Sequence, residues 1–580
     1  MNERLLEPLK YYETEGKATH EKNVNEYFDD LVTKSGINVE ENRATVKKYK
    51  KENDILTGMD KKLSRYKTAK VFLIIGIVLG AILTLISFVS FASSVSTGAI
   101  LLAIGAIMLV LCIMLLIKKV NPLIKKTGEI LEVQRKKVNE ILNEAYRQMA
   151  PLNDLFDERD TITLMETTLP EINFEDSFSK EQEELFIKHY DFIDLESEEC
   201  SMTKLLSGKF EGNPFLFCQC LMHELKSQTY HGTLLISWTE TYRDNEGRTR
   251  TRRRTQTLHA SVTKPKPFYH YNNYLAYGSQ AAPDLTFSRA PQVKANMDEK
   301  DIEKKVRKGE KELKKKAEKA ISTGGTFQEM ANAEFDVLFG AANRNNEVQF
   351  RLMYTPLAQR NTVELIKSKT GYGDDFYFTK QNRFNIITTD HAQNWNMDTS
   401  PDIYTSYDVD EARRKFLEHN MAFFKTVFFD FAPILSVPAY LESPCKSLEK
   451  PDTCVSNYPY YEHEAMANAF DKAHFLPERG IGEGILKTQF IEKSGNTDHV
   501  AVIGYGYEAY DRVDFVPTLG GDGRIHGVPV HWTEYIPVQR TRNVEITSTE
   551  MSKKEYHSKN GDILDQVSQY LRGMIGKITN

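Results

Sequence analysis

Two long apolar runs interrupt a chain that elsewhere mixes polar and apolar positions. The first, Val71–Ala92, has 22 residues without a charged side chain, and the second, Ala99–Ile117, has 19. At 1.5 Å per helical residue they extend roughly 33 and 28 Å, which matches the hydrocarbon core of a bilayer. Only Ser93–Gly98 separates the runs, so the pattern predicts an antiparallel transmembrane helical hairpin.

Basic residues flank both runs, and the loop between them has no charge. The positive-inside rule therefore predicts a membrane protein with two spans and both termini in the cytoplasm. Neither run contains Asp, Glu, Lys, Arg or His, which argues against a transporter built on one hairpin alone. The flanking basic residues are Lys61, Lys62, Arg65, Lys67 and Lys70 before the first run, and Lys118, Lys119, Lys125 and Lys126 after the second.

Small residues recur four positions apart in each run, at Gly76 and Gly80 and at Ala99 and Ala103. Such residues let helix backbones approach closely in lipid, so these four are candidates for helix packing within the hairpin or in a homo-oligomer. Ordinary glycine usage in a membrane helix is the alternative explanation.

Heptad-like spacing flanks the membrane runs on both sides. It predicts a coiled-coil stalk that continues the hairpin inward. Packing of these helices on the soluble region is the alternative. The positions are Val46, Tyr49, Leu56 and Leu63 before the first run, and Leu131, Val138, Leu142, Ala145, Met149 and Leu152 after the second.

The clearest element of the soluble region is a β-hairpin. Gly232–Tyr242 forms one strand, Asp244–Gly247 the turn, and Arg248–Val262 the return strand. Side chains alternate along a strand, so one face of the return strand carries arginines and the other carries threonines joined by one arginine. The arginines are Arg248, Arg250, Arg252, Arg253 and Arg254.

This arginine patch has several interpretations. Anionic lipid headgroups, an acidic protein partner or RNA would bind it, and a solvated charged edge that resists aggregation is the structural alternative. Aromatic residues do not interleave with the arginines, which makes nucleic acid the least favoured of these. The net charge of −6 over 580 residues also provides no global attraction for nucleic acid.

The remaining pattern predicts an α+β membrane protein: the two-helix hairpin, its stalk and a large mixed α+β cytoplasmic region. The expected segments are 1–70 (cytoplasmic helical), 71–117 (hairpin), 118–156 (stalk), 157–296 (α+β with the arginine hairpin), 297–323 (charged helix) and 324–580 (α+β). Individual expected elements are helices at Met297–Ile321, Pro356–Lys367 and Ala412–Phe431, strands at Glu347–Tyr354 and Phe384–Thr389, and a final amphipathic helix over Ile563–Ile575.

Cysteine chemistry is weakly indicated. Six cysteines in 580 residues fit a reducing compartment rather than a disulfide scaffold. Cys218, Cys220 and His223 form a C-x-C-x-x-H string, but a strand would place the histidine on the opposite face from the cysteines, which favours buried core cysteines over zinc ligands. Cys445 and Cys454 lie in a proline-containing loop without a nearby histidine.

Other motifs also fall short of a catalytic site. His463, Glu464 and His474 are expected on a helix, with both histidines on one face, but the H-E-x-x-H pattern is absent. The string Gly504-x-Gly506-x-x-Ala509 imitates a dinucleotide fingerprint, yet Pro517 follows too soon for the required helix. No catalytic residue, metal or cofactor is therefore assigned.

One segment resembles an uncharacterised family of bacterial integral membrane proteins with an N-terminal transmembrane hairpin and a cytoplasmic domain of unknown function. The resemblance rests on Ala333–Ile366, where Glu334-Phe335 is followed by Arg351, the Tyr354-Thr355-Pro356 turn and a helix. Together with the hairpin and stalk it covers about half the chain, and the region from about Asp390 does not fit. It implies a bacterial inner-membrane location and no assigned reaction.

These observations predict a membrane-anchored scaffold or partner-binding protein whose contact surface is the arginine strand. Its expected partners are the lipid bilayer, a protein, anionic lipid headgroups and further copies of the chain. One competing function is a membrane-tethered metal-dependent enzyme using His391, His463, Glu464 and His474. The other is an oligomeric channel assembled from several hairpins.

Overall fold

The chain is a mixed α+β protein with two long apolar helices and two antiparallel sheets. The computed structural model describes residues 3–90, 95–193, 197–243, 245–294, 297–395, 397–442, 454–550, 556 and 568–579. The chain divides into a first unit, Met1–His20, Ile162–Asp398 and Ala422–Asn580, and a second unit, Glu21–Thr161 and Thr399–Met421.

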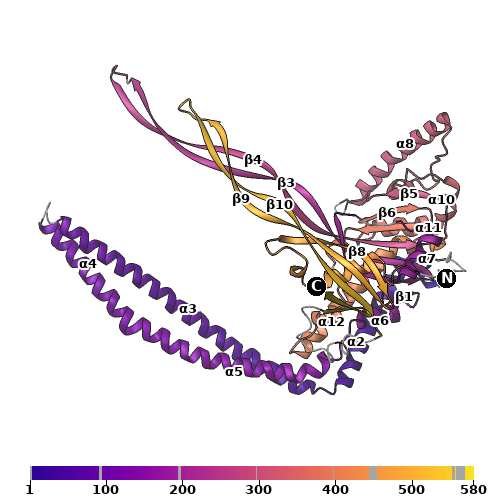
Figure 1. Cartoon of the computed structure of the whole chain (residues 1–580), viewed down its shortest axis with the longest axis horizontal. Coiled ribbons are helices and arrows are strands. Elements are labelled where there is room, and N and C mark those ends of the chain that lie inside the picture. The colour runs from indigo at the N-terminus through magenta and orange to yellow at the C-terminus, as the bar shows by residue number, and fades with distance from the viewer. Residues whose placement is uncertain are drawn as a thin grey trace. The chain divides into compact units, whose positions relative to one another are not determined.

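The described α-helices and β-strands have the following bounds (Figure 1). The helices are α1 (Pro8–Tyr11), α2 (Lys17–Ser35), α3 (Val39–Ser90), α4 (Val95–Leu115), α5 (Asn121–Asn153), α6 (Asp160–Thr168), α7 (Lys180–Tyr190), α8 (Glu299–Thr323), α9 (Ala333–Phe339), α10 (Glu347–Met353), α11 (Pro356–Lys367), α12 (Val409–Leu435) and α13 (Tyr460–Ala469). The strands are β1 (Ile172–Glu175), β2 (Cys200–Phe210), β3 (Asn213–Arg243), β4 (Thr249–Gly278), β5 (Thr286–Arg289), β6 (Phe376–Gln381), β7 (Phe384–Thr389), β8 (Ile481–Ser494), β9 (Thr497–Leu519), β10 (Ile525–Ser548), β11 (Ser568–Leu571) and β12 (Met574–Thr579).

The larger sheet of the first unit has seven strands in the order β1-β2-β3-β4-β7-β6-β5, with antiparallel neighbours. Its core is aromatic. The ring of Phe431 on α12 lies 4.9 Å from Phe210, 5.1 Å from Phe215 and 5.4 Å from Phe217, measured between ring centroids. Because a buried phenylalanine removes a large apolar area from water, this packing fixes the last part of α12 on the sheet.

The smaller sheet has five strands in the order β11-β12-β10-β9-β8, also antiparallel. Its core buries Met466 of α13 and Phe470 directly after this helix, together with the alternate positions Val500 and Val502 of β9. A period of two buried residues is the mark of a strand with one face on a core. The parts of β9 and β10 nearest their connecting turn extend beyond this core.

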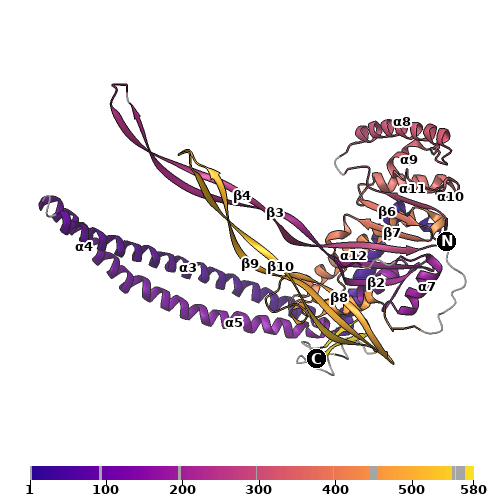
Figure 2. The same ribbon diagram turned by 45° about the horizontal axis from the view of Figure 1, so that its top comes forward.

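Two β-hairpins extend far beyond the sheets to which they belong. The first, formed by β3 and β4, is buried mainly at its base, and β3 alone has 31 residues, about 100 Å at 3.3 Å per residue. The second is formed by β9 and β10, which are paired along their whole length from Thr497 to Leu519. The two hairpins run side by side and twist about each other (Figures 1 and 2).

The second unit is built on α3, a single helix of 52 residues, with α4 and α5 alongside it. Two helical stretches, Val39–Phe88 and Ala99–Asn153, are long and apolar enough to cross a membrane. Away from the apolar part, α3 and α5 are joined by polar contacts. Gln134 and Lys137 of α5 both donate to the carboxylate of Glu52, each at 2.7 Å.

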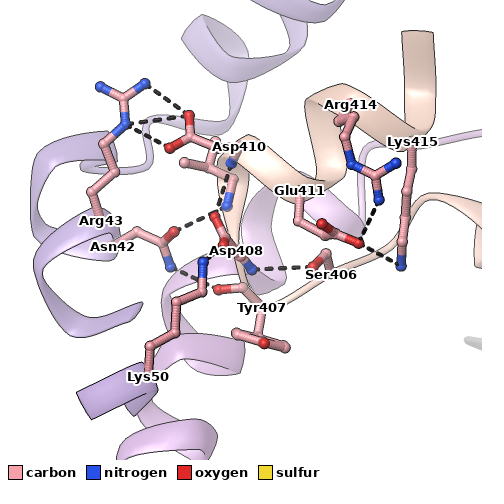
Figure 3. Close-up of polar contacts among 11 residues, drawn as sticks. Asn42, Arg43, Lys50, Ser406, Tyr407, Asp408, Asp410, Glu411, Arg414 and Lys415 are labelled. Carbon is pink, nitrogen blue, oxygen red and sulfur yellow. Dashed lines mark hydrogen bonds and ion pairs between the residues drawn. The ribbon is translucent and has the colours of Figure 1, made fainter. Parts of the chain in front are cut away.

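The segment before α12 is clasped to the first turns of α3, as Figure 3 shows. The amide group of Asn42 donates to the carbonyl of Tyr407 at 3.0 Å and accepts from the backbone N–H of Val409 at 3.1 Å. Arg43 pairs with Asp410 at 2.9 Å, and Lys50 with the nearly buried Asp408 at 2.9 Å. The hydrogen bond to Asp408 raises the pKa of Lys50, so this lysine keeps its positive charge at neutral pH.

Several predicted elements are confirmed and others are wrong. Four predicted elements are present: the helices at Met297–Ile321 (α8), Pro356–Lys367 (α11) and Ala412–Phe431 (α12), and the strand at Phe384–Thr389 (β7). Helix α12 extends beyond its predicted bounds at both ends, and the bounds of the other three differ by two residues at most. The predicted strand Glu347–Tyr354 is instead the helix α10. The side chain of Asn346 caps this helix by accepting a hydrogen bond from the backbone N–H of Gln349. The strand was predicted from the alternation of apolar residues alone, which gives no information on such a cap.

The predicted final helix over Ile563–Ile575 is also wrong where the structure describes it. Residues Ser568–Leu571 and Met574–Thr579 are strands, and β12 pairs with the far end of β10. Ile563, Leu564 and Val567 lie outside the described residues, as do Ala92, Ser93, Asp244 and Cys445. The coiled-coil register of the stalk stays a prediction.

Candidate binding surface on the hairpin arm

The paired parts of the two long hairpins form an arm, defined as residues 229–263 of the first hairpin and 511–533 of the second. Ile236, Leu258 and Val528 make a small apolar cluster between the hairpins. Lys264 adds a polar link at the base, since its Nζ lies 2.9 Å from Asp514. The same Nζ lies 4.2 Å from the ring centroid of Trp532, a cation–π distance. The arm is thus held by its own contacts.

Backbones approach closely at one point of the arm. A Cβ atom on Gly232 would lie 2.1 Å from the carbonyl oxygen of Pro529. Only a residue without a side chain fits there, because no rotamer change moves a backbone atom. This glycine sets the separation of the two hairpins.

The second hairpin ends before the first. The backbone N–H of Gly521, in the turn of the second hairpin, donates to Oε1 of Gln256 at 2.7 Å. Trp238 lies beside the same glycine. Past these residues the first hairpin continues for five residues on each strand, Thr239–Arg243 and Thr249–Arg253, or roughly 16 Å. This part, with the turn between its strands, is called the overhang (Figures 1 and 2).

The predicted arginine patch lies on the overhang, except for Arg254, which directly follows it at its base. In the observed register Arg252 faces Glu240 and Arg250 faces Tyr242 across the hairpin, while Arg254 faces Trp238 at the base of the overhang. Arg248 lies in the turn, 3.0 Å from Glu246. All five predicted arginines, Arg248, Arg250, Arg252, Arg253 and Arg254, are exposed.

Acidic residues on the overhang neutralise the arginines only in part. Arg254 Nε donates to Glu240 at 2.5 Å, and the side chain of Arg253 reaches Ser237 at 3.4 Å. Residues 239–254 contain six arginines and three acidic residues in all. A dense positive charge therefore lies at the end of a long arm, where an anionic target meets little steric hindrance.

Of the small residues predicted to pack in the membrane, the two glycines lie at a helix contact and the two alanines do not. Gly76 and Gly80 of α3 face α4, where a Cβ on Gly76 would lie 2.9 Å from Sγ of Cys112 and one on Gly80 3.2 Å from the carbonyl oxygen of Gly105. Ala99 and Ala103 are exposed on α4. Gly105, which the sequence pattern did not single out, is the small residue of α4 at this contact. A role of the alanines in oligomer packing stays a prediction.

The C-x-C-x-x-H string lies on β3 as expected. Cys218 and Cys220 are buried on one face, and His223 stacks on Tyr507 on the other, with ring centroids 5.4 Å apart. Burial raises the pKa of the Cys218 thiol, which keeps it protonated and unreactive. Cys454 is half-buried.

The histidines of the competing enzyme hypothesis do not meet. His463 and Glu464 are buried on α13, but His474 lies beyond the end of that helix in a 3-10 turn, so the expected shared face is wrong. His463 Nε2 lies 3.0 Å from Asp498, and Glu464 lies 2.6 Å from Lys487. Among the residues that the structure describes, no three His, Cys, Asp or Glu side chains are arranged to hold a metal ion.

His391 has a more unusual setting. Its Nδ1 lies 2.6 Å from Asp375 and its Nε2 3.4 Å from the buried Asp430, and the ring of Tyr372 stacks on it at 3.7 Å. Burial opposes a charge on the ring, but the hydrogen bond to Asp375 and the charge of Asp430 outweigh it and raise the pKa of His391. Burial also raises the pKa of Asp430 to about 6. The imidazole of His391 therefore holds its proton more tightly than a free histidine does.

Sequence reasoning named His391 but missed both aspartates. Asp375 directly precedes β6 and His391 closely follows β7, so the antiparallel pairing of these strands brings them together. The proximity of Asp375 to His391 could therefore have been predicted from the sequence by pairing these two strands. Asp430 comes from α12 and depends on tertiary packing.

No family model, curated protein or solved structure matches this chain. The resemblance at Ala333–Ile366 therefore stays a prediction, and function has to be argued from the surface itself.

Proposed function

We propose that this chain is a membrane-anchored binding protein that recognises an anionic target through the arginines of the overhang. The observation that supports the proposal is the placement of these arginines. They lie at the end of an arm, exposed and in excess over acidic residues. A charged edge needed only for solubility would not require an arm built from two hairpins and set by a close backbone contact at Gly232.

In this proposal α3 and α4 cross the inner membrane as a hairpin, with both termini in the cytoplasm. The two candidate spans and the basic residues on their flanks support this topology. Alkaline phosphatase inserted between the spans should be active in cells, whereas the same enzyme fused after Asn580 should be inactive. The reverse pattern would contradict the topology.

The binding role is tested by replacing the five arginines with serine in the full-length protein. Binding of poly-glutamate to the detergent-solubilised wild type should weaken steeply as salt is raised, because the attraction is electrostatic. The five-serine variant should lose this binding. The matched control removes five exposed lysines from α8, which changes the net charge equally at another place; these are Lys304, Lys308, Lys311, Lys315 and Lys319. If both variants lose binding to the same extent, the overhang has no special role.

A further inference from the structure

The outer face of the second hairpin is apolar and uncovered. Side chains at alternate positions of β9 and β10 point toward the first hairpin, and Val528 and Val530 there are fully buried. The intervening positions point away. On this outer face Val513 is 42% exposed, Phe515 70%, Leu519 69% and Ile525 73%.

This face also lacks ionic side chains. Its other members on the two strands are Pro517, Gly527, Pro529 and His531. None of these outward-facing strand positions between Val513 and His531 is Asp, Glu, Lys or Arg. The span from Val513 to Leu519 is roughly 20 Å long. A stripe of large apolar side chains with this exposure on a soluble surface indicates a site of contact.

Three of the arginines lie on the strand face of the first hairpin that the second hairpin covers nearer the sheet. Ile236 and Leu258 of the first hairpin face the second hairpin, and the period of two places Arg250, Arg252 and Arg254 on that same face. Past the turn at Gly521 nothing in the described arm covers this face. Along the arm, a cationic end is thus followed by an uncovered apolar stripe.

We infer that this part of the arm docks on the surface of an anionic lipid bilayer, with the arginines on lipid phosphates and the apolar stripe in the interfacial region. The inference rests on the proposed function and names its target. A bilayer offers phosphates directly above apolar chains, which complements both parts of the surface. An acidic protein surface would satisfy only the arginines, and a second copy would bring its own arginines.

The test uses the full-length protein in vesicles of phosphatidylcholine, with or without 30% phosphatidylglycerol. An environment-sensitive fluorophore is placed at Phe515→Cys, and the wild type labelled in the same way provides the blank for native cysteines. A matched probe at Thr239→Cys reports on the opposite, exposed face of the overhang. Lipids with a shallow quencher are added either to the protein's own vesicles or to a second, empty population, which shows which bilayer the arm meets.

The expected result is a blue shift and quenching at position 515 in anionic vesicles alone, with position 239 remaining in water. The variant R250S/R252S/R254S should weaken docking on the order of 100-fold, since each arginine near an anionic surface contributes about fivefold. Raising the salt concentration should weaken it further.

Three results would overturn the inference. One is a position 515 that stays in water in every vesicle, and another is an equal response at positions 515 and 239. The third is a blue shift in neutral detergent that grows with protein concentration, which would identify a second copy as the occupant. If poly-glutamate binding persists in these cases, the proposed function stands and only the bilayer is excluded as target; if that binding is also absent, both fail.

Discussion

A methyl group added at Gly232 should separate the two hairpins of the arm. In Gly232→Ala the new Cβ would lie 2.1 Å from the carbonyl oxygen of Pro529, whereas real Cβ contacts stay above about 3.0 Å. The backbones must therefore move apart by about 0.9 Å. Overpacking of this kind typically costs about 1–3 kcal/mol. The cost falls on the arm alone, because the base of each hairpin is held in its own sheet.

Hydrogen exchange measured by mass spectrometry would detect this change. Amides of β10 around Val528 and of β3 around Ile236 should exchange about 5- to 150-fold faster, since each 1.4 kcal/mol is a factor of ten in the local opening equilibrium. Gly527→Ala is the matched control, because its Cβ would lie 3.4 Å from the Cβ of Phe515, an ordinary contact. Equal protection in Gly232→Ala and the wild type would refute the described pairing of the hairpins.

Two buried charges of the first unit offer further predictions. Asp374→Ala leaves the fully buried guanidinium of Arg289, now 2.6 Å from Asp374, without its partner and should lower the free energy of unfolding by about 3–5 kcal/mol in denaturant titrations. The double variant Arg289→Met/Asp374→Leu should recover only part of this loss, because the Asp374 carboxylate also accepts from the backbone N–H groups of Gln292 and Val293. An equal loss in the double variant would contradict the explanation. Burial raises the pKa of Asp430 from 3.8 to about 6, so its contribution to stability is present below pH 3.8 and is lost as the pH rises through 6. The difference corresponds to about 3 kcal/mol. Asp430→Asn should therefore gain stability relative to the wild type as the pH rises from 3.8 to about 6, and a constant difference in unfolding midpoint over this range would refute this.

The arginine hairpin could be predicted from the sequence because the patterns that specify it are local. A turn sequence and a period of two place Arg250, Arg252 and Arg254 on one face without any tertiary information. The length of the strands was not readable. Beyond the sheet, β3 and β4 are supported by β9 and β10, which follow more than 200 residues later in the chain.

Where the local pattern was ambiguous, distant contacts or one cap decided the outcome. The apolar residues of the C-terminal segment fit a helical period, yet Met574–Thr579 is a strand because Val544 and Ile546 of β10 offer it an edge. The segment Glu347–Met353 alternates like a strand, yet the cap from Asn346 starts a helix. The apolar stripe on β9 was missed for a related reason, since only the pairing of the hairpins shows which face is covered.

The unbroken course of α3 gives the second unit the properties of a lever. Its polar part, Val39–Lys70, is about 48 Å long, so a 10° tilt of the apolar part about their junction would move the far end by about 8 Å if that end were free. That end carries Asn42, which holds the segment before α12, and Arg43, which pairs with Asp410 in the first turn of α12. A force that tilts the apolar part of α3 would thus displace the residues of the clasp, because no break in the helix absorbs the motion.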